Sequence, residues 1–188
     1  MEKRRLFPIG EQHFPSIIED GMVYVDKTAL IYDMVSSNKK YFLSRPRRFG
    51  KSLLCSTLEA YFEGRKELFK GLAIEQLETD WKKHPVFHFD FSVTKYLCVE
   101  DLRRVLNTQL KALENIFGTN PVDEVSPADR LFGLISRAAE QTGEKVVVIV
   151  DEYDAPMHDT LNNSELKQQL RQLQRQFFSP LKHQDKNL

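Results

Sequence analysis

The segment from Tyr41 to Ser52 constrains the fold of this chain more than any other. It predicts a short apolar strand over Tyr41–Leu43, a polar loop over Ser44–Gly50 and a helix that begins at Lys51. The first backbone N–H groups of such a helix have no acceptor within the helix, and the helix dipole favours an anion at that end. This order of strand, loop and helix is therefore typical of a phosphate-binding loop.

The residue types in this loop fit phosphate chemistry. Gly50 permits close approach of the backbone, Lys51 can reach the β- and γ-phosphates of a nucleotide, and Ser52 Oγ can ligate Mg²⁺. The complete pattern, G-x-x-x-x-G-K-[ST], has glycine at its first position, where this chain has Arg45. Because Gly-Lys-Ser alone is common by chance, the strand expected before it and the helix expected after it support much of the inference.

Charge is distributed unevenly along a chain that is neutral overall, with 27 Lys+Arg and 27 Asp+Glu. The neutral sum removes overall basicity as evidence for nucleic-acid binding. No acidic residue lies between Asp33 and Glu59. The cations in this interval are Lys39, Lys40, Arg45, Arg47, Arg48 and Lys51. A solvated basic loop is the alternative explanation, but the position beside an expected phosphate loop favours anion binding.

A second motif ends in two acidic residues. The β-branched run Val146–Val150 is typical of a strand buried on both faces, and Asp151 and Glu152 follow it. In P-loop ATPases an Asp at this place contributes to the Mg²⁺ site, and a following Glu can deprotonate the attacking water. We therefore expect Asp151 to be a metal ligand and Glu152 and Lys51 to be catalytic. Solvated acids at the end of a strand are the alternative.

Hydrophobic periodicity predicts the remaining elements. Alternation in Val86–Phe91 places three phenylalanines on one face of a strand. Strands that alternate with helices indicate an α/β domain with a mainly parallel sheet. Strands are expected over Met22–Val25, Tyr41–Leu43, Val86–Phe91 and Val146–Val150, and further helices begin near Asp26, Val99, Ser126 and Asn162.

Composition and cysteine usage exclude several classes of protein. With 41% hydrophobic and 29% charged residues, the chain is neither disordered nor a disulfide scaffold. It has no apolar run of membrane-span length and no secretory signal, so we expect no membrane partner. Cys55 and Cys98, without a CxxC motif, fit a reducing cytoplasm. His84 and His88 flank Pro85 in an expected strand, which argues against a zinc site.

Several segments resemble the bacterial AAA-ATPase-like family. The string Arg-Pro-Arg-Arg-Phe-Gly-Lys-Ser is the most specific of them, and Arg at the first Walker A position is usual in that family. The resemblance implies ATP binding and a P-loop NTPase fold of the additional-strand type, a three-layer αβα sandwich. By position, Lys51 and Ser52 match Walker A, and Asp151 and Glu152 match Walker B. The expected nucleotide-binding residues are Arg45, Pro46, Arg47, Arg48, Phe49, Gly50, Lys51, Ser52 and Leu53.

The resemblance also predicts the domain organisation. We expect residues 1–40 to form an N-terminal extension and residues 41–188 to form part of the ATPase core. Proteins of this family continue into another core strand and commonly into a domain similar to PD-(D/E)XK nucleases. We therefore expect a C-terminally incomplete fold with weak or absent ATP turnover, and a homo-oligomer is left open.

Three functions remain open from the sequence. The first is an ATP-binding module that uses Mg²⁺, with ATP hydrolysis in the complete protein. The second is a non-catalytic module that binds nucleic acid through Arg45, Arg47 and Arg48. The third is a vestigial structural domain.

Overall fold

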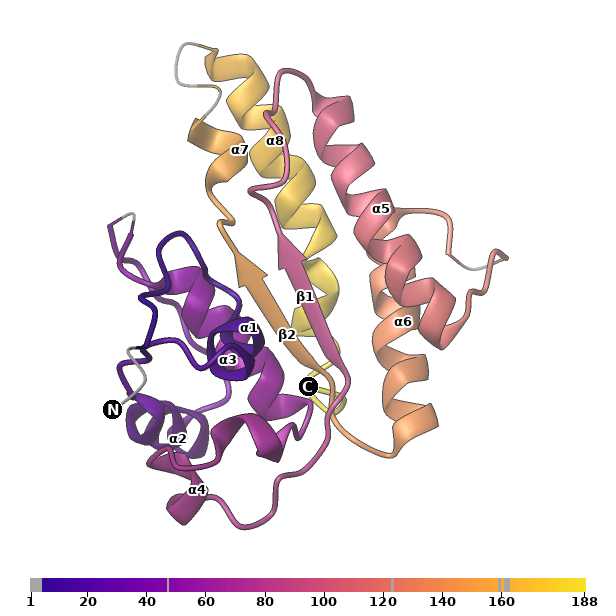
Figure 1. Ribbon diagram of the computed structural model, residues 1–188. Coiled ribbons are helices and arrows are strands. Elements are labelled where there is room, and N and C mark those ends of the chain that lie inside the picture. Colours follow the sequence, from indigo (N-terminus) through magenta and orange to yellow (C-terminus); the bar gives the residue numbers. More distant parts are fainter. Residues whose placement is uncertain (1–4, 47, 123, 159, 161–162) are drawn as a thin grey trace. The chain divides into compact units, whose positions relative to one another are not determined.

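The computed structural model describes residues 5–46, 48–122, 124–158, 160 and 163–188. These residues form two compact units, and the chain passes from the first to the second between Lys83 and His84 (Figure 1). Within the described ranges, no helix combines the length and the apolar character that crossing a membrane would require.

The first unit is helical. The longest of its helices is α3, which begins directly after the predicted phosphate loop. The backbone N–H of Phe14 donates to Ser56 Oγ at 3.0 Å, and this bond joins the start of α1 to the middle of α3. The ring of Phe69 packs between two others, with its centroid 4.9 Å from that of Phe14 and 5.1 Å from that of Trp81. The elements are α1 (Phe14–Glu19), α2 (Thr28–Ser37), α3 (Lys51–Phe62), the 3₁₀ helix η1 (Lys66–Phe69) and α4 (Ile74–Leu77).

Asp26 connects the start of α2 with α4. Its Oδ1 accepts hydrogen bonds from the N–H and the hydroxyl of Thr28 at 2.8 and 2.6 Å, and its Oδ2 accepts from the N–H of Ala73 at 2.7 Å. Burial raises the pKa of Asp26, but these hydrogen bonds outweigh burial and hold the pKa below its ordinary value. The predicted helix is confirmed and Asp26 supports its first turn, although Lys27 occupies the N-cap position.

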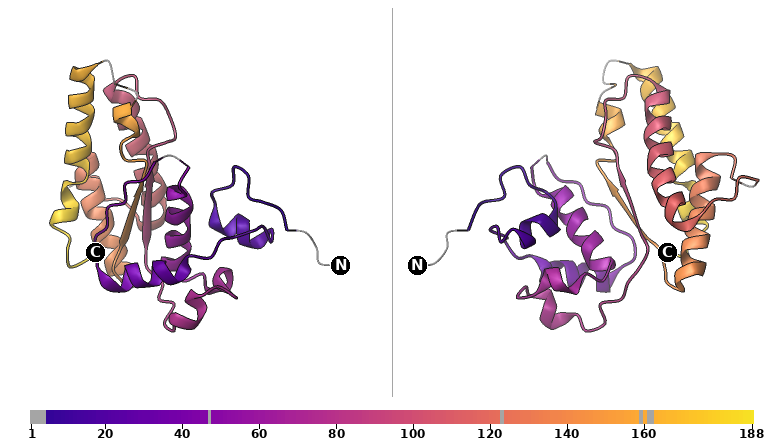
Figure 2. Two further views of the ribbon diagram at one scale, coloured as in Figure 1. Left: turned by 90° about the vertical axis from the view of Figure 1, so that its left-hand side faces the viewer. Right: turned by 45° about the vertical axis from the view of Figure 1, so that its right-hand side comes forward.

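The second unit is a mixed α/β structure built on a parallel pair of strands. Strand β1 (Val86–Asp90) pairs with β2 (Val147–Asp151), and Asp90 is the register partner of Asp151. Phe87 and Phe89 of β1 are fully buried in a core that α5, α6 and α8 complete from one side of the sheet (Figure 2). The other elements are α5 (Val99–Phe117), α6 (Pro127–Thr142), α7 (Ala155–His158), α8 (Ser164–Phe177) and the 3₁₀ helix η2 (Ser179–Lys182).

Side-chain caps begin two of the long helices, α6 and α8. Ser126 Oγ accepts from the N–H of Asp129 at 3.2 Å, and the Asp129 carboxylate accepts from the N–H of Ser126 at 2.9 Å. This reciprocal pair is a capping box, which satisfies N–H groups that the helix itself leaves unpaired. Asn162, near which this last helix is expected to begin, lies outside the described residues. Asn163 caps α8 by accepting from the N–H of Leu166 at 3.0 Å.

Two of the expected strands are wrong. Met22–Val25 and Tyr41–Leu43 lie in irregular backbone, and the side chains of Tyr41–Leu43 are 46–71% exposed. A strand is stabilised by its ladder of hydrogen bonds, and the two strands among the described residues pair with each other. The expectation of full burial for Val146–Val150 is also wrong, because Val147, Val148 and Val150 remain partly exposed in a sheet of this size.

Candidate functional site

The predicted phosphate loop ends in a left-handed glycine. Gly50 has φ +75° and ψ 26° and occupies the N-cap position of α3, which begins at Lys51 as predicted. A Cβ at this position would meet no atom within 4 Å, so the backbone conformation, and not lack of space, favours glycine. Throughout α3, whose residues are all described, no side chain caps the N-terminus and no acid lies in the first turn. This helix end can therefore receive an anion.

Lys51 folds back over its own loop. Its Nζ donates to the carbonyl oxygen of Arg45 at 3.2 Å and lies 3.5 Å from that of Pro46. These two contacts hold the ammonium of Lys51 against the loop that precedes it. This geometry places a cation and a helix N-terminus next to each other.

The other predicted residues of the loop differ in exposure. Arg45, Pro46, Arg48 and Phe49 are exposed, whereas Ser52 and Leu53 are half-buried at the start of α3. Arg47 lies outside the described residues. The exposed guanidinium groups can contact the phosphates of a nucleotide or of a nucleic acid, so the loop geometry alone does not separate these ligands.

The acidic strand end is built around a sharp turn. Asp151 closes β2 with 6% of its surface exposed, and its Oδ1 accepts from the N–H of Glu152 at 2.9 Å. Glu152 has φ +49°, a left-handed conformation that is strained for a residue with a side chain. Among described residues other than glycine, positive φ occurs at Arg48, Trp81 and Glu152. Two of these three residues therefore lie in the two candidate motifs.

The turn that follows Glu152 is held by α7 and α8. An Asp154 carboxylate oxygen lies 3.3 Å from His158 Nε2, and the carbonyl oxygen of Tyr153 accepts from Gln174 Nε2 at 2.8 Å. These contacts account for Asp154 without a metal ion. The other nearby acid, Asp159, lies outside the described residues.

The structure adds Asp90, a residue that sequence motifs alone had not assigned a role. It ends β1 directly beside Asp151, and its carbonyl oxygen accepts from Gln109 Nε2 of α5 at 2.6 Å. The signal was present in the sequence, since Val86–Phe91 was an expected strand that contained an acid near its end. What sequence could not supply was the register that pairs the two strand ends.

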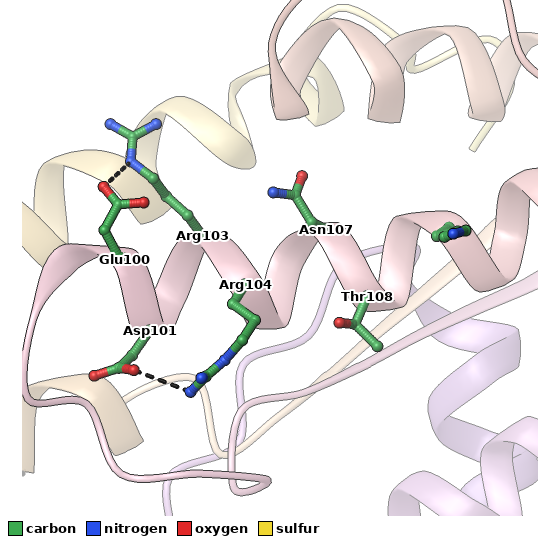
Figure 3. Close-up of a pocket in the computed structure, with 7 residues that line it drawn as sticks. Glu100, Asp101, Arg103, Arg104, Asn107 and Thr108 are labelled. Carbon is green, nitrogen blue, oxygen red and sulfur yellow. Dashed lines mark hydrogen bonds and ion pairs between the residues drawn. The ribbon is translucent and has the colours of Figure 1, made fainter.

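A shallow polar surface on α5 is accounted for by its own charges (Figure 3). Arg103 pairs with Glu100 at 3.3 Å, and Arg104 pairs with Asp101 at 3.0 Å. Because both pairs join residues three apart on one helix, they are ordinary surface pairs that neutralise each other. This surface therefore gives no support for an anion site.

Comparison with known proteins shows the family to which this chain belongs. The chain belongs to the AAA-ATPase-like family, described as predicted AAA-ATPases, whose profile matches residues 8–188.

A named relative comes from Azotobacter chroococcum mcd 1 and carries the name "Uncharacterized protein in vnfD 5′region". It is 38% identical to this chain over 184 residues, which is 97% of the chain. The chain spans 35% of that relative's length. No solved structure matches the chain.

Proposed function

We propose that this chain is the nucleotide-binding module of a P-loop ATPase and that it binds ATP with Mg²⁺. The observation that carries the proposal is the loop around Lys51, in which the ammonium is held on the carbonyl of Arg45 beside a left-handed Gly50. A triphosphate offers the negative charge that this cation and the open N-terminus of α3 attract. Arg45 and Arg48 add charge around the phosphates.

Each of the two motifs offers an oxygen donor of the kind that Mg²⁺ prefers. Ser52 supplies a hydroxyl and Asp151 a carboxylate, both hard oxygen ligands that Mg²⁺ prefers, in direct contact or through bound water. Bound Mg²⁺ would offset the charge that develops on the transferred phosphoryl group. For the complete protein, the proposed reaction gives Glu152 the role of accepting a proton from the water that attacks the γ-phosphate, and Lys51 the role of stabilising the phosphate charge.

The same proposal includes the finer fold, a three-layer additional-strand sheet with a mainly parallel order. Its support is the parallel pairing of β1 with β2 and the family membership. In addition, the N–H of Val146 donates to the carbonyl oxygen of Asn187 at 2.7 Å, so residues after η2 already contact the chain at the start of β2. ATP hydrolysis, assembly into oligomers and a nuclease-like domain are proposals for longer proteins such as the relative.

A second candidate function is nucleic-acid binding by the basic loop. The exposed side chains of Arg45 and Arg48, in an interval without acids, favour it. Such binding depends on the loop arginines and needs no Lys51. A shared site for ATP and nucleic acid would make the two ligands compete.

Hydrogen exchange tests where the nucleotide binds. Addition of ATP with Mg²⁺ should slow exchange in residues 44–54, whose N–H groups would bind phosphate, and leave residues 66–77 of the same unit unchanged. The latter segment, which contains η1 and α4, is the internal control. Absence of protection in residues 44–54 at saturating ATP would contradict the proposal and favour a structural domain. Protection by single-stranded DNA alone would favour the second candidate.

A further inference from the structure

We propose that the exposed face of α8 binds the phosphate backbone of duplex DNA. This surface, the α8 polar face, consists of Gln168, Arg171, Gln172 and Arg175. All four side chains are exposed, and all four belong to the second unit. The α8 polar face shares no residue with the loop of the first unit, so DNA binding here and ATP binding there are tested separately.

The α8 polar face lies opposite the residues that anchor the helix. Leu170, Leu173 and Phe177 are buried in the core of the second unit. With 3.6 residues per turn, the four side chains of the α8 polar face lie on the other side of the helix. That side points away from the core (Figure 2), so a partner can reach it.

The two arginines of this face differ from the other arginines of the second unit, which form ion pairs. The paired ones are Arg103, Arg104, Arg130 and Arg137. Arg171 and Arg175 have no ion pair with any residue that the structure describes. Glu165, the single acid of α8, lies more than a turn before Arg171. The charge of this face is therefore not neutralised by its own helix.

The spacing of cations along α8 also points to an anionic partner. Lys167, Arg171 and Arg175 recur at every fourth residue, about 6 Å apart along the helix axis. Like charges at this spacing destabilise a helix. Bound phosphate groups would offset the repulsion between these cations, so the arrangement suits a ligand that carries a row of negative charges.

The residue types favour DNA over other anionic partners. Arg and Gln both donate hydrogen bonds to phosphate oxygens, and the major groove of a duplex admits an α-helix. Interfaces with DNA are more polar and more positively charged than interfaces with proteins. A membrane surface would have to receive apolar side chains, and α8, all of whose residues are described, exposes only polar ones.

Fluorescence anisotropy of the full chain with a labelled DNA duplex over a salt series tests the proposal. Arg171→Gln with Arg175→Gln removes both charges and keeps residues that favour a helix. We expect its affinity at low salt to fall about tenfold or more, and the slope of log affinity against log salt to decrease by about two, one for each lost phosphate contact. Gln168→Ala with Gln172→Ala should weaken binding without changing that slope, because no charge is lost.

Arg103→Gln with Arg104→Gln is the matched control. It makes the same change of charge in the same unit, on arginines that are already paired, and should alter the affinity and the slope far less. Equal losses in the two arginine double variants would show a response to net charge alone and would overturn the proposal. Undiminished duplex binding in Arg171→Gln with Arg175→Gln would overturn it as well.

Other ligands and variants separate DNA from its alternatives. Polyglutamate that binds as tightly as the duplex would indicate an acidic protein partner, and tighter binding of single-stranded DNA would exclude a duplex site; either result overturns the proposal. Arg171→Lys with Arg175→Lys keeps both charges and should keep the salt slope. A slope as low as that of the glutamine variant would contradict the proposal even if both variants unfold at a lower temperature than the wild type.

Discussion

The ammonium of Lys51 donates to the carbonyl oxygen of Arg45 at 3.2 Å, across the loop that joins them. The lysine side chain therefore contacts the backbone of its own loop. Because a charged donor prefers a charged acceptor, a phosphate oxygen can replace the carbonyl without rearrangement of α3. The proposed nucleotide site at this loop therefore makes a prediction about Gly50, the glycine that ends the loop.

Gly50→Ala should weaken ATP binding and destabilise the first unit by about 1–2 kcal/mol. The cost arises because alanine disfavours the left-handed conformation that Gly50 adopts at φ +75°. Fluorescence of Trp81, the single tryptophan, follows unfolding of this unit because its ring is 8% exposed in the core.

Gly71→Ala is the matched control for Gly50→Ala. Gly71 has φ +80° and open space around its Cβ position, as Gly50 has, but it lies in the turn before α4. The two variants should lose similar stability, and Gly50→Ala alone should lose ATP affinity. Equal ATP affinity in both variants would show that the conformation of Gly50 has no part in binding.

The first unit should lose stability in acid through Asp26. The pKa of this carboxyl is lower in the folded chain than in the unfolded chain, so its contribution is present above the unfolded pKa. The contribution is lost as pH falls through the folded pKa, which lies below the ordinary value of about 3.9 for Asp. Protonation disrupts the bonds from Thr28 and Ala73.

Asp26→Asn should therefore flatten the dependence of unfolding temperature on pH in the range below about pH 4. Trp81 fluorescence during thermal unfolding provides the measurement. Asp33→Asn, an exposed substitution on the same helix α2, should keep the wild-type dependence. A pH dependence in Asp26→Asn as steep as that of the wild type would contradict the assignment.

Arg130→Leu should destabilise the second unit by about 2–3 kcal/mol. The Arg130 guanidinium binds both carboxylate oxygens of Glu114 at 2.6 and 2.9 Å. The Arg130 side chain is 19% exposed and the Glu114 side chain is 11% exposed. Its loss leaves the largely buried Glu114 charge without this partner. Arg103→Leu breaks an exposed pair on α5 and should cost about 0.5 kcal/mol or less. Urea unfolding followed by circular dichroism compares the free energies of unfolding of the two variants. Similar decreases in both would contradict a stabilising role for the largely buried ion pair between α5 and α6.

Nucleic-acid binding makes a different prediction for the loop arginines. Arg45→Ala with Arg48→Ala should reduce the affinity for single-stranded DNA and flatten its salt dependence, because fewer counterions are released. Lys51→Ala should leave such binding nearly intact. Fluorescence anisotropy with a labelled oligonucleotide over a salt series measures both. Loss of binding in Lys51→Ala alone would contradict an arginine-based nucleic-acid surface.

Sequence periodicity predicted the elements whose partners are near in the chain. The helices expected near Val99, Ser126 and Asn162 are confirmed as α5, α6 and α8, because a helix satisfies its own backbone hydrogen bonds. The short helix α1 was missed, although Phe14 and Ile17 are both buried at helical spacing. Pro15 in its first turn was the available signal.

Strands were less predictable because each needs a partner that may lie far along the chain. Val86–Phe91 and Tyr41–Leu43 are both short apolar segments, yet only the first forms a strand, paired with β2. The same limit applied to the candidate site. The motif from Gly50 to Ser52 is a short continuous segment, so the sequence alone predicts it. The pairing of Asp90 with Asp151 depends on the register between two strands that are distant in the sequence.

Isothermal titration of the chain with ATP and Mg²⁺ tests the central claim most directly. We expect saturable binding by the wild type and a loss of about tenfold or more in Lys51→Ala, the cost of removing a charged hydrogen bond to phosphate. Lys39→Ala, which removes a cation outside the loop from the same acid-free interval, should bind ATP nearly as the wild type does. Equal affinities for ATP in Lys51→Ala and the wild type, or no binding by either, would contradict a nucleotide site at this loop.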